Sequence, residues 1–406
     1  MIAGKFNCLL DQAYGSSGKG KISTYLADRY SITSVSSANF PNAGHTASFS
    51  NGTKFVAKAI PTAAILKKVT GLGMQCFLSP GSGFNWIQLI KEWDESGRPE
   101  IFIHSRASLV TPEHKRRESE GNDSTKHIAS TMQGSAAAMV DKILRKREVQ
   151  LAGTTPLEEI VNSLDLNKSH STGPGEAIQL GDEWIPEFLQ KVHVLEAHEF
   201  RNLTHSTLEA GQTWLHEGSQ GYALSIDHGS HYPFCTARNS TLQAQMDYMA
   251  IPPNLVGDVY LNLRSKPIRV GNVVEDNVQK GFSGDFYPDC HELTWEQVAA
   301  EAGMPVEEAR VLAERERTTV TKRIRRVATF SYVGLQDAVR TNGATKLIMN
   351  FIQYIDWKDN GLRDFNKLSK KSREFIDNIE KVAGVPVVLV GTGPHHDDII
   401  VRENLL

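Results

Sequence analysis

The chain has 406 residues, 40% of them hydrophobic, which is enough to bury a large core and indicates a globular protein. Its 44 Lys and Arg residues nearly balance its 47 Asp and Glu residues, and the formal net charge of -3 excludes a general attraction to nucleic acid or to an anionic membrane surface. Any phosphate-binding site must therefore be local. No stretch reaches the roughly 20 apolar residues that a membrane helix needs, and we expect neither a membrane anchor nor an export signal.

The cysteines are scattered along the chain, at Cys8, Cys76, Cys235 and Cys290, and no two of them form a CxxC pair. This spacing argues against a zinc site and against a disulfide framework. We therefore expect a protein of the reducing cytoplasm.

Regular elements alternate along the chain. Short apolar runs predict buried strands at residues 6–10, 347–352 and 385–390. Stretches with a period of 3.6 residues predict helices at residues 19–30, 84–96, 135–147, 295–317 and 369–383. This pattern predicts an α/β fold. The polar segments 115–127 and 272–289 offer few apolar anchors and are candidate mobile loops, but neither resembles a linker, so we expect one domain over residues 1–406.

A glycine-rich segment, Tyr14–Lys21, follows the first predicted strand and opens the first predicted helix. Free backbone N–H groups and the helix dipole favour anions at such a point, which makes it a candidate phosphate loop. It satisfies the GxxxxGK pattern, but Ile22 stands where a hydroxyl residue normally holds Mg²⁺. Taken alone, the segment could equally be a glycine turn with two solvated lysines.

Four further motifs accompany this loop, and their order along the chain carries information. They are Asn42–Thr46 (NAGHT), Ser130–Gly134 (STMQG), Glu217–Gly221 (EGSQG) with Ile226–Gly229 (IDHG), and Gly391–Pro394 (GTGP). In this order and together with the loop, they resemble the adenylosuccinate synthetases. The resemblance implies a single large α/β domain with a mostly parallel central sheet flanked by helices, acting as a homodimer. It also implies a reaction in which a nucleoside triphosphate phosphorylates the purine O6 and the amine of L-aspartate then displaces phosphate at C6.

The resemblance also assigns catalytic and phosphate-binding roles. His45 would act as an acid at O6, and the carbonyl of Gly44 would help to hold Mg²⁺. The donor phosphates would lie on the loop, at Ser16, Ser17, Gly18, Lys19, Gly20 and Lys21. Considered alone, residues 42–44 could be a turn with His45 as a cap or a core histidine.

By the same resemblance, hydroxyl and amide side chains hold the purine monophosphate, at Asn42, Ser130, Thr131, Gln220 and Thr236. Arg145 occupies the position from which the family supplies an arginine to the 5'-phosphate of the neighbouring subunit. A guanidinium group binds phosphate oxygens through charge-assisted hydrogen bonds. The alternative for residues 145–147 is a solvated basic helix end.

The segment 318–326, TTVTKRIRR, resembles the aspartate-binding loop of the family. Two carboxylates need bidentate donors, which arginine supplies and lysine does not. We assign Thr321, Arg323 and Arg325 to the aspartate substrate. An exposed cationic loop is the alternative, and it suits Lys322 and Arg326.

Ser16 departs from the family pattern, which has an aspartate that removes the N1 proton of IMP and binds Mg²⁺. A neutral hydroxyl is a poor base, so Ser16 would need help from water, from Mg²⁺ or from the phosphate. The smaller side chain leaves room for a 2-amino group and therefore for guanine. This substitution resembles the phage branch of the family, the N6-succino-2-amino-2'-deoxyadenylate synthases, which convert dGMP on the route to 2-aminoadenine in DNA. Because an aspartate can also accept from guanine N1 and N2, the loss of charge alone does not demand guanine.

Gln353 is the second departure, since the family reads the donor guanine with an aspartate at this position. A neutral amide offers one donor and one acceptor, the pattern that matches adenine, so we expect ATP or dATP as the donor. Asn350, Gly391, Gly393 and Pro394 would complete this pocket. A strand-end glutamine bonded to backbone is the alternative.

The sequence thus predicts a Mg²⁺-dependent ligase with Ser16 and His45 as catalytic residues, which joins L-aspartate to dGMP at the expense of ATP or dATP. A divergent enzyme that uses IMP and GTP is the first alternative, and a nucleotide-binding regulator without activity is the second. We expect no nucleic-acid or membrane partner.

Overall fold

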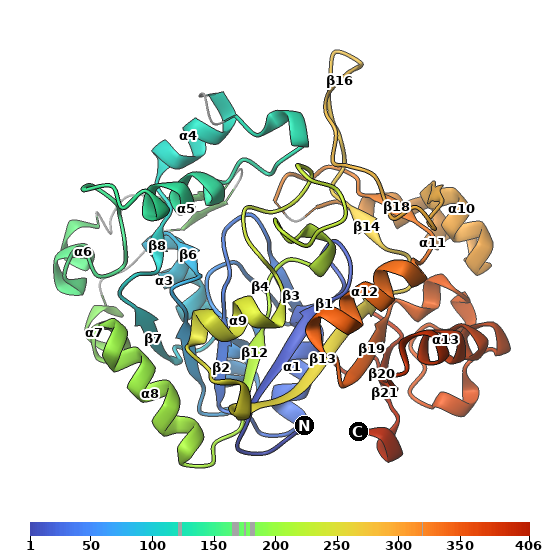
Figure 1. Cartoon of the computed structure of the whole chain (residues 1–406), viewed down its shortest axis with the longest axis horizontal. Helices are drawn as coiled ribbons and strands as arrows, with labels where there is room; N and C mark the ends of the chain where they lie inside the picture. The colour runs from blue at the N-terminus through green and yellow to red at the C-terminus, as the bar shows by residue number, and fades with distance from the viewer. Residues whose placement is uncertain (121–123, 165–169, 174–175, 179–182, 319) are drawn as a thin grey trace.

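The protein is described here by a computed structural model, which covers residues 1–120, 124–164, 170–173, 176–178, 183–318 and 320–406. Its centre is a ten-stranded sheet with the order β11-β7-β5-β2-β12-β1-β13-β19-β20-β21 (Figure 1). Neighbouring strands run parallel except at the edge, where β21 is antiparallel to β20. In sheet order the strands are Val192–Leu195, Glu100–His104, Gln75–Leu78, Ser34–Ser37, Trp214–Glu217, Phe6–Asp11, Val256–Arg264, Lys346–Asn350, Val387–Gly391 and Ile399–Val401.

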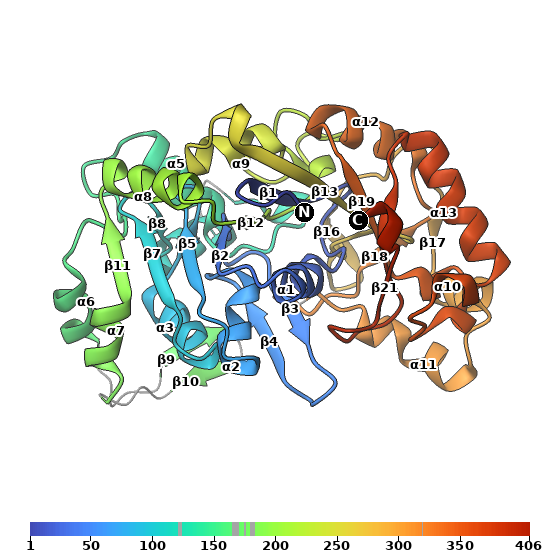
Figure 2. The same ribbon diagram turned by 90° about the horizontal axis from the view of Figure 1, so that it is seen from below.

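Helices cover both faces of this sheet. Figure 2 shows α1, α2 and α3 on one side and α8, α9 and α12 on the other. The α-helices α1 to α13 are Lys19–Arg29, Leu66–Val69, Trp86–Glu95, Pro112–Glu120, Ser135–Ile143, Leu157–Ser163, Ile185–Lys191, Ala197–Glu209, Leu242–Met249, Trp295–Ala302, Val306–Arg315, Tyr332–Asn342 and Lys370–Ala383.

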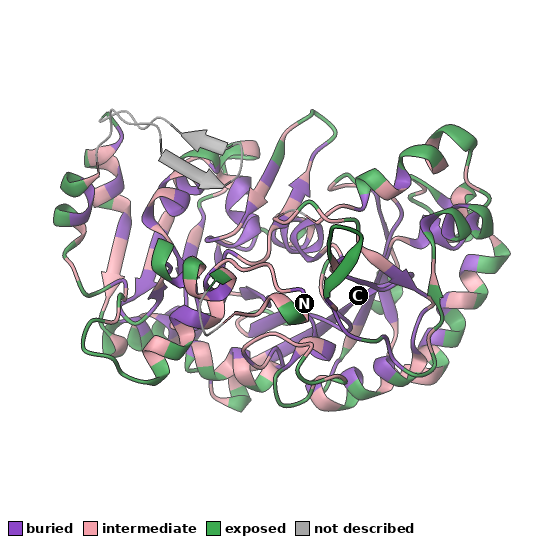
Figure 3. Cartoon of the chain, turned by 90° about the horizontal axis from the view of Figure 1, so that it is seen from above, coloured by how far each residue is buried: buried purple, intermediate pink, exposed green. Residues whose placement is uncertain are grey.

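Each face of the sheet has its own hydrophobic core, and strand β1 shows how the sequence separates them. Phe6, Cys8 and Leu10 pack in one core, which also includes residues of α8, α12 and α13. Leu9 packs in the other core with residues of α1 and α3. This alternation follows from the two-residue period of a strand, and burial on both faces explains the nearly continuous apolar run. Figure 3 shows the central strands as buried.

Small sheets accompany the central sheet. They pair β3 (His45–Ser48) with β4 (Lys54–Ala57), β6 (Gly83–Phe84) with β8 (Ser108–Leu109), β9 (His170–Gly173) with β10 (Glu176–Ile178), β15 (Val273–Glu275) with β16 (Val278–Gly281), and β18 (Arg326–Ala328) with both β14 (Ile268–Arg269) and β17 (Glu292–Leu293). The hairpin β15–β16 projects from the body of the molecule (Figure 1).

The structure corrects several predicted boundaries. The helix expected at residues 295–317 is two helices, α10 and α11, because Gly303 ends the first with φ +64° and Pro305 caps the second. The strand expected at residues 347–352 ends at Asn350, where Phe351 turns the chain with φ +60°. The two candidate loops contain regular structure, because α4 extends into the first and the hairpin β15–β16 occupies part of the second.

The predicted α/β class with a mostly parallel sheet is confirmed. One domain stays a prediction, which gains support because strands from both ends of the chain share one sheet. Among the described residues, no helix combines the length and the apolar character needed to cross a membrane. All four cysteines are free thiols in the structure.

Candidate functional site

A cavity of about 1110 Å³ lies at the carboxyl edge of the central sheet. The strands that end there finish with polar residues, namely Asp11 on β1, Glu217 on β12, Arg264 on β13 and Asn350 on β19. Carboxyl ends of parallel strands meet at one edge, which is where open α/β sheets bind their ligands. Among the residues that the structure describes, the lining contains eight Lys and Arg side chains against three Glu and no Asp, so this part of the cavity is cationic although the chain is not.

The predicted phosphate loop lines this cavity from Tyr14 to Lys21. Gly18 caps α1 with φ +89°, a conformation that glycine adopts without a steric penalty. Asp11 lies beneath the loop and is 2% exposed. Its Oδ1 accepts from the amides of Ala13 and Gly15 at 2.9 and 3.3 Å. Asp11 therefore fixes the backbone of the loop at the end of β1.

Both loop lysines are buried and hydrogen-bonded, unlike the solvated lysines of the alternative interpretation. Lys19 Nζ lies 2.9 Å from Asp11 Oδ2 and donates to the carbonyl of Gln220 at 2.8 Å. Lys21 Nζ donates to the carbonyls of Gly393 and Asp398 at 2.7 and 2.9 Å. Burial lowers the pKa of Lys21 to about 7, because desolvation disfavours the charged form.

His45, at the start of β3, lines the cavity and is hydrogen-bonded through Nδ1 to Glu217 Oε1. Glu217 is 1% exposed and also accepts from the amide and the hydroxyl of Thr62, at 3.0 and 2.9 Å. Burial acts to raise the pKa of Glu217, but the nearby His45 and the three donors outweigh it and hold this pKa below its usual value. A carboxylate at Nδ1 leaves Nε2 of the same ring to serve as the acid.

The hairpin that carries His45 packs tightly against α1. A Cβ atom on Gly20 would lie 2.8 Å from the amide nitrogen of Thr46, closer than real Cβ atoms come to backbone. Only glycine therefore permits this approach between the phosphate loop and strand β3.

The residues predicted to hold the purine monophosphate come together at the cavity. Asn42, Ser130, Thr131, Gln220 and Thr236 all line it. The buried Oδ1 of Asn42 and Nε2 of Gln220 lack a hydrogen-bond partner within the described part of the chain. Buried polar atoms are rarely left unpaired, so these two are available to a ligand.

Ser16 is exposed at the cavity and adopts φ +51°. Its carbonyl accepts a hydrogen bond from Arg264 at 2.8 Å. The guanidinium of Arg264 stacks on the ring of Phe351 at 3.7 Å from its centroid and pairs with Glu316 at 2.5 Å. Position 16 is thus fixed by its backbone, while its side chain remains free to face a substrate.

Of the predicted aspartate-binding residues, Arg325 lines the cavity and Thr321 and Arg323 do not. Arg325 lies 3.4 Å from Glu316, and its buried Nε lacks a partner among the described residues. Arg323 donates to Thr321 Oγ1 at 3.1 Å and to the carbonyls of Ala129 and Ser130 at 2.9 Å. These two residues connect the loop 318–325 to the segment that carries Thr131.

The predicted donor-base residues Asn350, Gln353, Gly393 and Pro394 line the cavity, whereas Gly391 lies within β20 and does not. Gln353 is 7% exposed, and its Oε1 lacks a partner in the part of the chain that is described. This contrasts with the alternative of a glutamine whose acceptor is bonded to backbone. Apolar side chains complete this part of the lining, at Met304, Leu312, Phe351 and Trp357.

Arg145 is exposed, has φ +53° and lies outside the cavity, two residues beyond the end of α5. The apolar side chains beside it are also exposed: Val140 is 43%, Ile143 70% and Leu144 60% accessible. Arg145 therefore does not contribute to the cavity of its own chain.

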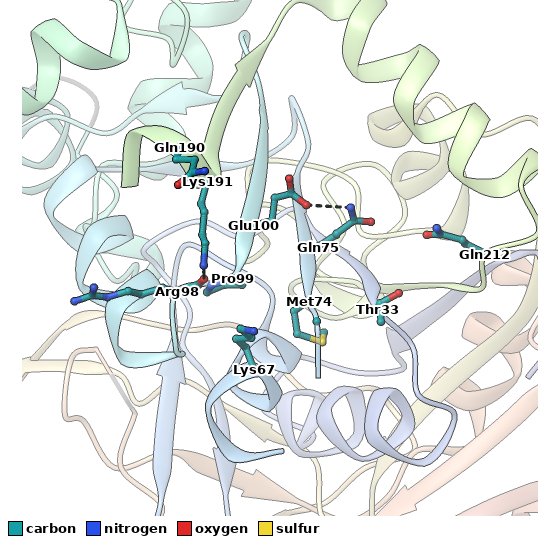
Figure 4. A pocket seen from close by; sticks show the side chains of 11 residues that line it. Thr33, Lys67, Met74, Gln75, Arg98, Pro99, Glu100, Gln190, Lys191 and Gln212 are labelled. Atoms are coloured by element: carbon teal, nitrogen blue, oxygen red, sulfur yellow. Dashed lines mark hydrogen bonds between the residues drawn. The ribbon is translucent and has the colours of Figure 1, made fainter. Parts of the chain in front are cut away.

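A second hollow, of about 590 Å³, lies at the opposite edge of the sheet (Figure 4). Its polar side chains contact one another and neighbouring backbone. Gln75 donates to Glu100 at 3.0 Å, and Lys191 donates to the carbonyl of Arg98 at 3.3 Å. The unpaired polar atoms described above therefore distinguish the cavity at the carboxyl edge from this second hollow.

Sequence reasoning missed Asp11, Glu217, Arg264 and Glu316 as site residues. Asp11, Glu217 and Arg264 could have been found from their positions at the ends of strands. Polar residues at the carboxyl ends of buried parallel strands meet at one edge of the sheet, where ligands bind. Glu217 even stood within a motif that the resemblance had drawn attention to. Glu316 carried no such signal, because its pairing with Arg264 joins positions 52 residues apart.

Comparison with known proteins agrees with this geometry. The N6-succino-2-amino-2'-deoxyadenylate synthase of Vibrio phage phiVC8 is 30% identical over 98% of both chains. The adenylosuccinate synthetase of Methanocaldococcus jannaschii is 28% identical over 97% of this chain and 95% of its own. The structure of succinoaminodeoxyadenylate synthetase from cyanophage S-2L, bound to dGMP and dATP as an energy donor, superposes with a TM-score of 0.75 at 27% identity, covering 98% of this chain and 96% of that one. The family model for adenylosuccinate synthetase matches residues 8–359, and the chain therefore belongs to the adenylosuccinate synthetase family.

Proposed function

We propose that this enzyme joins L-aspartate to C6 of dGMP with ATP or dATP as the phosphoryl donor. The products are N6-succino-2-amino-2'-deoxyadenylate, the nucleoside diphosphate and phosphate. The observation that carries the proposal is the serine at position 16, which faces the cavity on a loop where the family usually has a carboxylate. The similarity to phage synthases of this product and to a structure bound to dGMP and dATP supports it.

The reaction proceeds in two steps. The guanine O6 takes the γ-phosphoryl group of the donor while the N1 proton leaves, which gives the nucleoside diphosphate and a 6-phosphoryl purine. The aspartate amine then attacks C6, the C–O bond breaks, phosphate leaves and the nitrogen loses a proton. Phosphorylation is needed because a purine oxygen is a poor leaving group, and holding three substrates together makes each attack effectively unimolecular.

The loop lysines and His45 have separate tasks in this scheme. Lys19, Lys21 and the amides at the start of α1 hold the donor phosphates and stabilise the charge that develops during transfer. His45 donates a hydrogen bond or a proton at O6, and Glu217 holds its ring in the orientation that this requires. Because Glu217 is buried and bonded to Thr62, it keeps this orientation before substrates arrive.

The residues assigned to Mg²⁺ fit the ion as part of a nucleotide complex. The Gly44 carbonyl and the Ser16 hydroxyl are neutral oxygen donors on one cavity, and Mg²⁺ usually takes few protein ligands beside substrate phosphates. Within the described ranges no cluster of His, Cys, Asp and Glu side chains offers a separate cage. When bound, the ion would neutralise charge on the transferred phosphoryl group.

Each substrate has a matching part of the cavity. Gln353 offers an amide to the donor adenine beside an apolar wall, and Asn42 and Gln220 present unpaired polar atoms to the acceptor nucleotide. Arg325, assisted by Thr321 and Arg323 in the same loop, binds the aspartate carboxylates.

We further propose a homodimer in which Arg145 reaches the acceptor phosphate in the neighbouring subunit. The exposed valine, isoleucine and leucine beside Arg145 form an apolar surface suited to such a contact. Mixing Arg145→Ala chains with His45→Ala chains should restore activity that neither variant has alone, because the mixed dimer would hold one intact site. Continued inactivity of a mixed dimer would contradict the shared site.

Steady-state phosphate release with four substrate pairs tests the function. We expect turnover with dGMP and ATP or dATP in the presence of aspartate, and little turnover with IMP and GTP. Activity confined to IMP with GTP would overturn the substrate assignment, and nucleotide binding without phosphate release would indicate a protein that has lost catalysis. The four free cysteines suit a reducing compartment, which for a phage enzyme is the host cytoplasm.

A further inference from the structure

Arg238 is a buried cation whose charge the protein does not compensate. It is 6% exposed and lines the cavity at the carboxyl edge of the sheet. Its guanidinium donates to the carbonyls of Gly81 and Ala38, at 2.6 and 2.5 Å, and to the hydroxyl of Ser219. All three acceptors are neutral, and within the described part of the chain no carboxylate forms an ion pair with Arg238.

Such an arrangement is costly in a protein without ligand. A buried charge is normally paired with an opposite charge, because hydrogen bonds to neutral groups replace only part of its hydration. Burial accordingly lowers the pKa of Arg238, and the most important neighbour acting against this is the phenol of Tyr248. The ring of Phe40, 5.0 Å from the guanidinium, stabilises the cation without neutralising it.

The contacts of Arg238 place it at the base of the acceptor site. Ala38 precedes the segment that leads to Asn42, and Ser219 precedes Gln220. Thr236 lies two residues before Arg238 itself. The three chain segments assigned to the purine monophosphate therefore meet at this guanidinium, and the ligand that they receive carries a dianionic 5'-phosphate.

We infer that Arg238 is the buried counter-charge for the 5'-phosphate of the acceptor nucleotide, supplied from within the same subunit. The phosphate provides the negative charge that the fold omits, while the neutral acceptors hold the guanidinium in place. This inference rests on the proposed function, since it requires a purine monophosphate at Asn42, Gln220 and Thr236. It differs from the role of Arg145, which would come from a second chain.

The test compares ligands that differ only in the phosphate. Calorimetric titration of the full-length enzyme with dGMP and with deoxyguanosine measures both affinities in the wild type, Arg238→Gln and Arg238→Lys. The glutamine variant removes the charge, and we expect dGMP to bind about 10- to 100-fold more weakly while deoxyguanosine changes by less than about three-fold. The lysine variant keeps the charge and should retain most of the dGMP affinity.

A matched control is Arg98→Gln, which removes the same charge at the opposite edge of the sheet and should leave both affinities unchanged. Equal weakening of dGMP and deoxyguanosine in Arg238→Gln would assign Arg238 to the framework of the site and overturn the inference. Wild-type dGMP affinity in that variant would also overturn it. If Arg238→Gln does not fold, Arg238→Lys decides, because a framework role predicts that it weakens both ligands equally.

The outcome is separable from that of the proposed function. If the wild type binds IMP and not dGMP, the same comparison is made with IMP and inosine. A loss confined to the monophosphate would then support Arg238 while contradicting the guanylate assignment. Failure of the wild type to bind either monophosphate would overturn both.

Discussion

Replacing Glu217 with glutamine should impair catalysis because it disturbs the placement of His45. The carboxylate accepts from three donors, His45 Nδ1 and the amide and hydroxyl of Thr62, and it is 1% exposed. Glutamine keeps one acceptor oxygen but puts an NH₂ group where the second oxygen was. A donor would then face either the imidazole or the Thr62 amide.

The magnitude follows from these contacts. Losing a charge-assisted hydrogen bond costs about 1.5 to 3 kcal/mol, and a buried donor left unpaired costs about 1 to 3 kcal/mol. If most of the first cost appears in the transition state, kcat should fall about 10- to 100-fold. The second cost should appear as lower stability in chemical denaturation.

The assay is phosphate release at saturating dGMP, ATP and aspartate. Thr62→Val is the control: it removes the hydrogen bond from the Thr62 hydroxyl and keeps the carboxylate beside His45, so kcat should stay within about three-fold of the wild type.

A folded Glu217→Gln enzyme with wild-type kcat would refute the reasoning. His45 would then need no carboxylate partner. Equal loss in Thr62→Val would instead locate the effect in the stability of the segment around residue 62.

Three further predictions concern the substrates. Ser16→Asp should lower the use of dGMP relative to IMP, on the order of ten-fold, in steady-state competition. The left-handed backbone conformation at this position tolerates Asp, so the variant should fold. An unchanged preference would show that Ser16 does not select the acceptor base. Gln353→Asp should weaken ATP binding by about 1 to 3 kcal/mol, and an unchanged apparent ATP constant would exclude this residue from the adenine pocket. Burial lowers the pKa of Lys21 to about 7, so this lysine should take up a proton when bound donor phosphates favour its charged form. Titration calorimetry in buffers of different ionisation enthalpy should therefore detect an uptake of about 0.9 proton at pH 8 and about 0.1 at pH 6. Equal proton uptake at both pH values, or proton uptake by the Lys21→Arg variant, would contradict this prediction.

The sequence identified much of the fold and the phosphate loop because both depend on local patterns. The two-residue and 3.6-residue periods report burial directly, and the glycines of residues 15–20 mark a strand-to-helix turn. Local signals also have limits. The helix expected at residues 295–317 continued its period across Gly303 and Pro305, and only these breaking residues indicated the interruption that the structure shows.

Pairings across the sheet were out of reach of sequence reasoning. Glu217 and His45 are 172 positions apart, and Arg264 and Ser16 are 248 apart. Arg264 reaches Ser16 because β13 flanks β1, the strand that leads into the phosphate loop, and Glu217 reaches His45 because α1 contacts both β12 and β3. Both arrangements are properties of the assembled fold. The burial of Arg238 likewise could not be predicted from the sequence, because it depends on contacts with Gly81 and Ala38, which are far from it along the chain.

The close fit of Gly20 against strand β3 has a mechanical consequence. The phosphate loop and the hairpin that carries His45 touch backbone to backbone at Gly20 and Thr46, with no side chain between these two residues to absorb a displacement. A shift of either one is passed to the other. With the donor on this loop and His45 as the proton donor, as proposed above, docking of the triphosphate should align the imidazole. Any substitution that separates these two segments should then uncouple hydrolysis of the donor from transfer to the purine.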